Sequence, residues 1–405
     1  MGRVMGRVTR GATGGLMGAV PTWVRRDVRR RWPSLVVLAV LVALVVGSGA
    51  AALAGARRQA SVVDRLRSDA LGMDALIAAN PQIHYPWTRF DQLPYVEGRW
   101  GLVEVAGARV ASIHDGDWLT TTGDAAFGST VDRFVVIEGR AYDPATPGEL
   151  VVSPQFAKAN HVHVGDTLDV RLPTVAQARR AWRRQESAEK ITGPHTTWRV
   201  VGIVTNTWLG PPETSSPLGK AAVSPATLVA DRAHLLGDAT IEQATVGSIF
   251  RLADPATDIA RLTADARRLS GSDDVDVWNI DERFYKPARD GNRFEALTLA
   301  AFGALALLAG LFLVGSSVAR ASAAEAIELR RGMAVGMTPG QVTVAASVAT
   351  ALACAAGTVL GLLAAYAGSR WLPIGDARLY EPRPGASFDA PVLLLTGAIV
   401  GAAFV

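Results

Sequence analysis

The chain alternates between long apolar windows and stretches of mixed polarity. Three windows contain no charged residue, Leu35–Ala56, Ala296–Ala319 and Gly332–Ser369, and a fourth runs from Ala390 to Val405. An α-helix needs about 20 residues to cross about 30 Å of hydrocarbon, and each of the first three windows is long enough. The pattern therefore predicts transmembrane helices in these windows and the beginning of another in the fourth.

The regions between the windows have the ordinary mixture of a folded domain, so the predicted fold class is a membrane protein. It has four transmembrane α-helices, the last incomplete, and a large α+β extracytoplasmic domain between helices 1 and 2. The expected boundaries are 1–34 (a cytoplasmic basic segment at the membrane interface), 35–56 (helix 1), 57–293 (the extracytoplasmic domain), 294–319 (helix 2), 320–340 (a cytoplasmic segment), 341–369 (helix 3), 370–389 (an extracytoplasmic loop) and 390–405 (the truncated helix 4).

The fourth window is too short to be a complete span. About 16 residues from Ala390 reach roughly 24 Å at 1.5 Å per residue, which is less than the thickness of the hydrocarbon core. We therefore expect the native chain to continue beyond Val405.

Basic residues dominate the start of the chain and set its expected orientation. Arginines stand at positions 3, 7, 10, 25, 26, 29, 30 and 31, against the single acid Asp27. The positive-inside rule places this segment in the cytoplasm, which puts 57–293 outside. A cleaved signal peptide is the competing interpretation, but its apolar core would have only about 7–15 residues. The first window is longer and Arg57 follows it at once, so a retained helix is favoured.

Composition narrows the class of protein further. Only 19% of residues are charged, which is less than the roughly one quarter of an ordinary soluble protein. The net charge of +4 is concentrated at the N-terminus, where it serves orientation, so no nucleic-acid partner is expected. The single cysteine, Cys354, lies in an apolar window, so the extracytoplasmic domain has no disulfide. The excess of arginine over lysine, with abundant Ala, Val and Gly, is typical of a GC-rich bacterial genome and indicates a bacterial plasma membrane.

Secondary structure in the extracytoplasmic domain is predicted by β-branched runs and by capping residues. Runs bounded by turn residues predict strands at Arg133–Arg140, Gly148–Ser153, Asp166–Leu172 and Thr197–Thr205. A helix is predicted after Asp254, with Pro255 at its first position and Gly271 at its end. Val175–Lys190 is a second helix candidate, rich in Arg and Gln.

The sequence offers no means of hydrolysing ATP. A phosphate-binding P-loop requires G-x-x-x-x-G-K-[ST]. The one Gly-Lys pair, Gly219-Lys220, is followed by Ala221, and Thr214 stands where the first glycine is needed. No G-x-S-x-G or catalytic-triad spacing is present either. We therefore expect no enzyme activity, and any ATP hydrolysis must come from another polypeptide.

Metal binding is also a weak interpretation of the sequence. His161 and His163 would project from one face of an extended strand, close to Asp166, but a zinc site needs a further ligand. A strand leading into the turn at Gly165 is the favoured alternative. The run Asp273–Asp276 lacks the glycine and the distal glutamate of a calcium loop, so a solvated turn is expected there. No metal and no cofactor are predicted.

Two pairs of glycines have the G-x-x-x-G spacing of helix–helix contacts in membranes. Gly357 and Gly361 lie in one apolar window, and Gly397 and Gly401 in another. Small residues let helix backbones approach closely, but Ala/Gly-rich helices also contain the spacing by chance, and the sequence leaves both explanations open. The windows carry no intramembrane charge, which argues against an ion-coupled transporter.

One segment after the second window resembles a known family. The run ELRRGMAVGMTPGQV, from Glu328 to Val342, is similar to the glutamate, Leu-Arg-Ala-x-Gly and Gln segment of the FtsX/MacB-like permease family of ABC transporters. Gly332 and Met333 depart from the usual leucine and arginine, and Arg330 or Arg331 can substitute. The stretch VVIEGRAYDPATPGELVVSPQFAKANHVHVGDTLDV resembles the family's periplasmic core domain, TWRVVGIV its later strand, and the N-terminal opening its actinobacterial members.

The resemblance implies a permease of the mechanotransmission type. In such a system a separate cytoplasmic ABC ATPase drives the membrane helices and changes the shape of the outer domain, for export, lipoprotein handling or control of cell-wall enzymes. It implies that Glu328, Arg330, Arg331 and Gly336 couple the chain to that ATPase. It also implies that the chain contacts membrane lipid and a second permease copy or half. The alternative is a membrane-anchored extracytoplasmic sensor or scaffold that binds a ligand without ATP.

The residues around this segment agree with a rigid connector. Ala319–Val335 is rich in Ala, Glu, Leu and Arg, which are strong helix formers. Thr338, Pro339 and Gly340 then break the chain before the next window. A short helix that ends in a sharp turn is suited to receiving a push from a partner, although an ordinary helical hairpin would show the same pattern.

Overall fold

The computed structural model describes residues 12–80, 83–103, 108–110, 119–120, 122–182, 190–209, 220–334 and 339–404. The description leaves out the side chains of 12–28, 109, 120, 181–182, 321–334, 339–346 and 403–404. The chain divides into two compact units. Unit 1 comprises Met1–Gln59, Phe294–Pro373 and Gly385–Val405, and unit 2 comprises Ala60–Arg293 and Ile374–Pro384.

Unit 1 consists of helices. They are α1 (Ala12–Ala60), α10 (Lys286–Ala334), α11 (Pro339–Gly368) and α12 (Ala390–Phe404), with the short η2 (Ser369–Trp371) after α11. The start of α10, up to Arg293, belongs to unit 2. Three stretches are long and apolar enough to cross a membrane, namely Arg29–Ala60, Asp281–Arg320 and Ser347–Trp371, whereas the apolar helix Ala390–Ala402 is shorter. The first two long predicted windows are therefore helical, as are the described residues of the third, and helix α1 already begins within the segment expected to lie at the interface.

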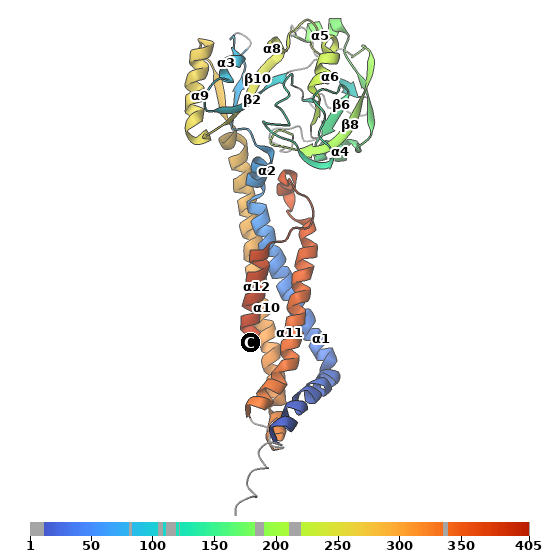
Figure 1. The fold of residues 1–405 in the computed structure, drawn as a ribbon, viewed down its shortest axis with the longest axis vertical. Helices are drawn as coiled ribbons and strands as arrows, with labels where there is room; N and C mark the ends of the chain where they lie inside the picture. The colour runs from blue at the N-terminus through green and yellow to red at the C-terminus, as the bar shows by residue number, and fades with distance from the viewer. Residues whose placement is uncertain are drawn as a thin grey trace, which may run out of the picture. The chain divides into compact units, whose positions relative to one another are not determined.

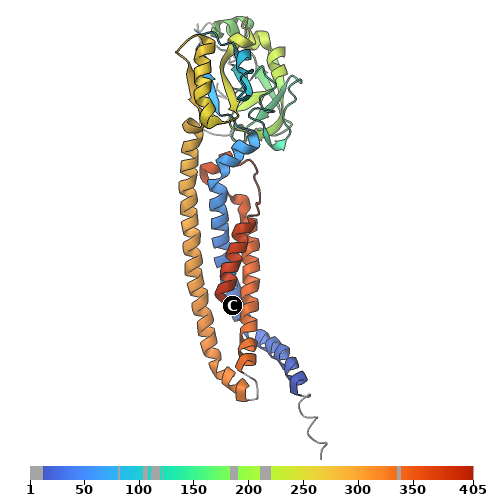
Figure 2. The ribbon, with the colours of Figure 1, turned by 60° about the vertical axis from the view of Figure 1, so that its left-hand side comes forward.

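The helices of unit 1 run alongside one another and share a buried apolar cluster (Figures 1 and 2). Val42 and Val46 of α1 meet Val314 of α10, Cys354 of α11 and Val400 of α12 in this cluster. Large apolar side chains on the outside of the same helices remain exposed within the described part of the chain. Unit 1 thus buries apolar residues between its helices and also presents large apolar residues outside.

Unit 2 contains two sheets. The first is a four-stranded antiparallel sheet of order β11-β1-β10-β2. Its strands are β1 (Ala75–Ala78), β2 (Val96–Val103), β10 (Thr245–Leu252) and β11 (Asp276–Asn279). Helices α3 (Trp87–Phe90) and α9 (Pro255–Ser270) pack on it through a core that includes Phe90, Phe250, Leu262 and Ala266 (Figure 1).

The second sheet has the order β3-β7-β8-β6-β9-β4, with β5 paired to β8. Its strands are β3 (Arg109–Val110), β4 (Leu119–Thr120), β5 (Val135–Gly139), β6 (Glu149–Val152), β7 (Thr167–Arg171), β8 (His195–Thr205) and β9 (Ala221–Val223). The four predicted strands are confirmed as β5, β6, β7 and β8. Short helices flank this sheet, namely α4 (Pro154–Asn160), α5 (Val175–Trp182), α6 (Pro225–Ala230), α7 (Arg232–Leu235) and α8 (Ile241–Ala244).

The helix after Asp254 is confirmed with both of its ends. The Asp254 side chain accepts a hydrogen bond from the Ala256 amide, Pro255 occupies the first turn, and Gly271 caps the end at φ 69°. The second candidate forms α5 from Val175 to Trp182, and the rest of the predicted segment lies largely outside the described residues.

The expected strand at His161 is wrong. Residues 154–160 form α4 instead, because Ser153 caps the helix by accepting from the Phe156 amide and Pro154 starts it. His161 then ends α4 in the left-handed region at φ 54°. The two histidines therefore follow a helix end and do not alternate along a strand.

Three further segments belong to unit 2. Helix α2 (Val62–Ala70) follows α1 after Ser61, and η1 (Asp281–Tyr285) is a π-helical turn that leads directly into α10. The 3-10 segment η3 (Gly375–Tyr380) lies in the chain between α11 and α12. Val62 and Leu66 of α2 share one apolar core with Trp100, Ile249 and Tyr285, so these segments are packed against the sheets.

Candidate functional site: the Arg67–Arg289 ionic cluster

Charged residues gather in unit 2 where α2, β1 and the start of α10 meet. Asp64 and Arg67 lie three residues apart on α2, which brings their side chains to one side of the helix. Asp281 begins η1, and Arg289 follows eight residues later on α10. A spacing of eight is twice the i, i+4 spacing, so the two side chains lie on nearly the same side of the helix. Asp74 directly precedes β1. We call these five residues the ionic cluster.

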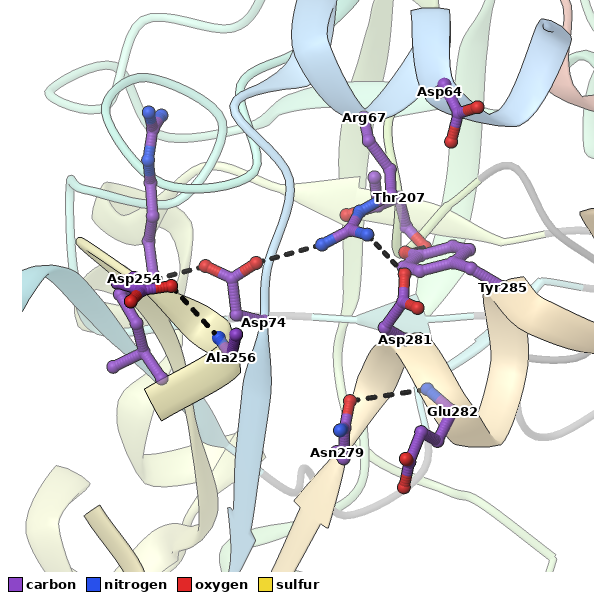
Figure 3. Close-up of polar contacts among 12 residues, drawn as sticks. Asp64, Arg67, Asp74, Thr207, Asp254, Ala256, Asn279, Asp281, Glu282 and Tyr285 are labelled. Atoms are coloured by element: carbon purple, nitrogen blue, oxygen red, sulfur yellow. Dashed lines mark hydrogen bonds and ion pairs between the residues drawn. The ribbon is translucent and has the colours of Figure 1, made fainter. Parts of the chain in front are cut away.

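The two arginines of the ionic cluster each bind two carboxylates. Arg67 donates from Nη2 to Asp74 Oδ1 at 2.8 Å and from Nη1 to Asp281 Oδ1 (Figure 3). Arg289 donates from Nη1 to Asp64 Oδ1 at 3.2 Å and from Nη2 to the other carboxylate oxygen of Asp281. Asp281 therefore joins the two guanidinium groups, and the cluster ties α2, β1 and α10 together with opposite charges in alternation.

Asp74 is the most buried acid of the cluster. Its side chain is only 8% exposed, and its second oxygen accepts from the Leu252 amide of β10 at 2.9 Å. Burial raises the pKa of the Asp74 carboxyl, while the Leu252 amide and the Arg67 charge act in the opposite direction. Because Asp74 also accepts from Leu252, the cluster contacts the end of β10, an inner strand of the four-stranded sheet.

An aromatic side chain connects the ionic cluster to a second buried acid. The Arg67 guanidinium carbon lies 5.1 Å from the ring centroid of Tyr285 (Figure 3), which favours the cation by a cation–π contact. Tyr285 is fully buried, and its hydroxyl donates to the Thr207 carbonyl at 3.0 Å. The Thr207 amide in turn donates to Asp132 Oδ1 at 2.8 Å.

Asp132 is completely buried, and one of its carboxylate oxygens has no hydrogen-bond donor among the described residues. Oδ1 accepts from the amide and the hydroxyl of Thr207, whereas Oδ2 has no partner there. Burial raises the pKa of Asp132 to about 7. Its backbone lies in the left-handed region at φ 51°, and Asn206 Nδ2 donates to its carbonyl at 2.8 Å.

The arrangement suits mechanical linkage better than bond chemistry. Each carboxylate of the ionic cluster is bound to an arginine, and each arginine bridges two elements. Paired charges of this kind fix the relative position of the elements that carry them, and removal of one partner leaves the other charge uncompensated. The ionic cluster is thus a junction between the chain segments that enter and leave unit 2.

The described residues contain no cluster of three or more His, Cys, Asp or Glu side chains able to hold a metal ion. His163 Nδ1 lies 3.7 Å from Asp166 Oδ2, but the two side chains are 80% and 48% exposed. This pair is a solvated surface contact at the end of α4.

The predicted coupling residues fall mostly beyond what the structure describes. Glu328, Arg330 and Arg331 lie within the bounds of α10, but their side chains are outside the described residues. Gly336 is outside the described residues altogether. Their role in coupling stays a prediction.

The two glycine pairs differ in their surroundings. A β-carbon at Gly357 would stand 2.5 Å from the Ala39 carbonyl oxygen, and one at Gly361 would stand 2.7 Å from that of Ala43, both on α1. At Gly397 the nearest neighbour would be a Leu362 methyl at 3.7 Å, and at Gly401 no described atom would lie within 4 Å. The first pair therefore lies at a backbone-to-backbone contact of α11 with α1, and the second does not.

Sequence reasoning missed the ionic cluster. Its local signal is present, since acids and arginines recur at helical spacing on both sides of the predicted extracytoplasmic domain. Nothing in that spacing says that position 67 meets position 281, because the pairing depends on the register of β1, β10 and β11. Compared with models of known protein families and with curated protein sequences, the chain matches none of them.

Proposed function

We propose that the chain is the permease subunit of an ABC transporter of the mechanotransmission type. In this proposal a separate cytoplasmic ATPase moves the membrane helices, and unit 2 is the extracytoplasmic domain that changes shape in response. The output is export, lipoprotein handling or control of a cell-wall enzyme. The sequence resemblance motivates the family, and the ionic cluster supports the mechanical part of the mechanism.

A lipid environment in the bacterial plasma membrane accounts for the surface of unit 1. Phe302, Leu305 and Phe312 on α10 are more than 60% exposed within the described part of the chain. Contiguous apolar surface of this kind is unfavourable in water but suits contact with hydrocarbon. We propose that α1, α10, α11 and α12 all cross the bilayer, with the N-terminus in the cytoplasm and a second permease copy or half beside them.

The observation that carries the proposal is the pairing of α2 with η1 and α10. Helix α2 follows the apolar helix α1, and η1 leads into the apolar helix α10, so both are the places where unit 2 continues into a membrane helix. Arg67 with Asp281 and Arg289 with Asp64 lock these two places together. A displacement of either helix end would therefore be passed to the other and, through Asp74, to the four-stranded sheet.

The partner ATPase is proposed to dock on 320–340. Glu328 and Arg331 cannot be placed in lipid cheaply, so they should face water or a partner. We include Gly336 in the docking segment because glycine, which has no side chain, suits a tight turn or a close approach to a partner. A push on this segment would act directly on α10, whose other end carries Arg289.

The proposal is tested by ATP hydrolysis in a reconstituted complex. The complex contains the full chain and the ATPase that copurifies with it in mild detergent. Gly336→Val, and separately the double reversal Glu328→Arg with Arg331→Glu, should weaken copurification or lower the stimulated hydrolysis. Gly315→Val in α10 is the matched control, because no described atom lies within 4 Å of a β-carbon there.

Both test variants should insert into the membrane and fold unit 2 normally, since the changes lie outside unit 2. A membrane-anchored sensor or scaffold has no need of 320–340, so it predicts no effect on any nucleotide-binding protein. Unchanged copurification together with unchanged hydrolysis for both variants would refute the docking role and favour the sensor.

A further inference from the structure

The segment Ile374–Pro384 belongs to unit 2, although helices of unit 1 precede and follow it in the chain. Ala377 and Tyr380 of η3 are 0% and 1% exposed, and both lie in the apolar core that contains Val62, Val63 and Leu66 of α2. A connecting loop normally runs over the surface, because its backbone groups need water. This segment instead contributes an aromatic side chain to the core of the domain.

Ion pairs fix the same segment to α2. Arg65 Nη2 lies 2.8 Å from Glu381 Oε2, and the Glu381 side chain is only 4% exposed. Arg383 Nη2 lies 2.9 Å from Asp69 Oδ1, while the Arg383 amide donates to the second oxygen of Glu381 at 3.2 Å. Arg65 and Asp69 are four residues apart and so share one face of α2.

Helix α2 therefore has two charged faces with different partners. Asp64 and Arg67 bind the start of α10 through the ionic cluster, and Arg65 and Asp69 bind the segment between α11 and α12. The burial of Glu381 makes the second contact costly to open, because a lone carboxylate would remain out of water.

We infer that Ile374–Pro384 is a clasp that delivers movement of α11 and α12 to unit 2 through α2. The transmitting role of the clasp rests on the proposed function, whereas its contacts with α2 do not. In that mechanism α2 receives two inputs, one from α10 at Arg67 and one from the clasp at Arg65, and it combines them before the sheets respond. The unit 2 response would then require α11 and α12 to move together with α10.

The residues that flank the clasp in the chain are bound within unit 1. Arg58 Nη1 donates to the Ser369 carbonyl at 3.0 Å and to the Gly385 carbonyl at 2.9 Å. Arg57 Nη1 lies 3.0 Å from Asp389 Oδ1. The residues before and after the clasp are thus bound to the end of α1.

The first measurement is amide hydrogen exchange of the full chain in lipid nanodiscs, without any ATPase. Glu381→Arg and Arg65→Glu should each raise exchange in 374–384 by about tenfold or more, since a tenfold change corresponds to about 1.4 kcal/mol of opening free energy. The double variant, Arg65→Glu with Glu381→Arg, should restore protection. Arg268→Glu, an exposed charge on α9, is the matched control and should leave 374–384 unchanged.

The second measurement is stimulated ATP hydrolysis by the complex with the copurifying ATPase. The single reversals should lower the stimulation toward the rate of the ATPase alone, and the double variant should recover it. Unchanged exchange in both single variants would overturn the clasp. Raised exchange with full stimulation, in a complex that does respond to Gly336→Val, would overturn its transmitting role and leave the proposed function standing. A complex that responds to none of these changes would overturn the proposed function instead, and the exchange result alone would then decide whether the clasp exists.

Discussion

A β-carbon added to Gly47 of α1 would stand 3.2 Å from the carbonyl oxygen of Gly361 on α11. The relation is mutual, since a β-carbon at Gly361 would stand 3.0 Å from the Gly47 amide nitrogen. The two backbones therefore touch at a point where neither helix has a side chain. Close approach of small residues is a main source of helix association in lipid, where the hydrophobic effect between helices is lost. In a lipid environment this contact would favour association of α1 with α11.

Gly361→Val should weaken this contact. The added side chain cannot be accommodated without separating the two backbones, and overpacking of this kind costs about 1–3 kcal/mol. The measurement is reversible unfolding of the purified full chain in mixed detergent micelles. Gly401→Val is the control, because its β-carbon would have no described atom within 4 Å. Equal losses for the two variants would show that the cost reflects valine in a helix and not the contact.

Arg67→Met should destabilise unit 2 strongly. The change leaves Asp74, with a side chain only 8% exposed, without its guanidinium partner, and loss of one member of a buried pair costs about 3–5 kcal/mol. Denaturant unfolding followed by tryptophan fluorescence measures the change, because Trp100 and Trp198 are fully buried in unit 2.

Arg268→Met is the matched control for this loss. Arg268 is 65% exposed and pairs with Asp265 within one turn of α9, so its removal should leave the free energy of unfolding nearly unchanged. A similar small cost for Arg67→Met would mean that the ionic cluster adds no stability.

Capping residues and β-branched runs correctly predicted the helix and strands whose position depends on neighbouring residues alone. Asp254, Pro255 and Gly271 each act within a few residues of their own position, and α9 begins and ends accordingly. The strands β5 to β8 followed from β-branched runs between turn residues. The strand predicted at His161 was wrong because the helix cap at Ser153 outweighed the alternation of the histidines.

Contacts between residues far apart in the chain could not be predicted from the sequence. The pairing of Ala75 with Phe250 builds the four-stranded sheet, yet β1 is only four residues long and carries no alternation that could identify its partner. Tyr380 lies in a segment read as a loop, and its burial depends on α2, far away in the chain. The ionic cluster depends on the pairing of β1 with β10 and β11, so its members could be seen in the sequence but their contacts could not be predicted.

The proposed orientation predicts which single cysteines react from outside the cell. In a Cys354→Ser background, Ser187→Cys should be labelled on intact cells by a membrane-impermeant maleimide, and Ser322→Cys should not, because 57–293 is expected outside and 320–340 inside. Labelling of both after permeabilisation is the control for reactivity. Labelling of Ser322→Cys but not of Ser187→Cys would show that the chain has the opposite orientation.

Asp132 should make unit 2 less stable as the pH rises toward 7. Burial raises the pKa of its carboxyl from the usual 3.8 to about 7 in the folded protein, so the folded state holds a proton that the unfolded state releases more readily. The stability that this proton confers is fully present below pH 4 and is lost as the pH rises through about 7. At about 1.4 kcal/mol for each unit of pKa, the full loss is about 4 kcal/mol.

Asp132→Asn should remove this dependence. Asparagine keeps an oxygen to accept from the Thr207 amide and tolerates the left-handed backbone at this position, but it cannot ionise. The free energy of unfolding of the variant, measured relative to wild type by denaturant titration at pH values from about 4 to 8, should therefore rise with pH and level off above pH 7. Asp273→Asn, at an exposed aspartate, is the control and should follow wild type throughout. A difference between Asp132→Asn and wild type that stays constant from pH 4 to 8 would mean that Asp132 is ionised in the folded protein across this range, with a donor to Oδ2 that burial alone does not supply.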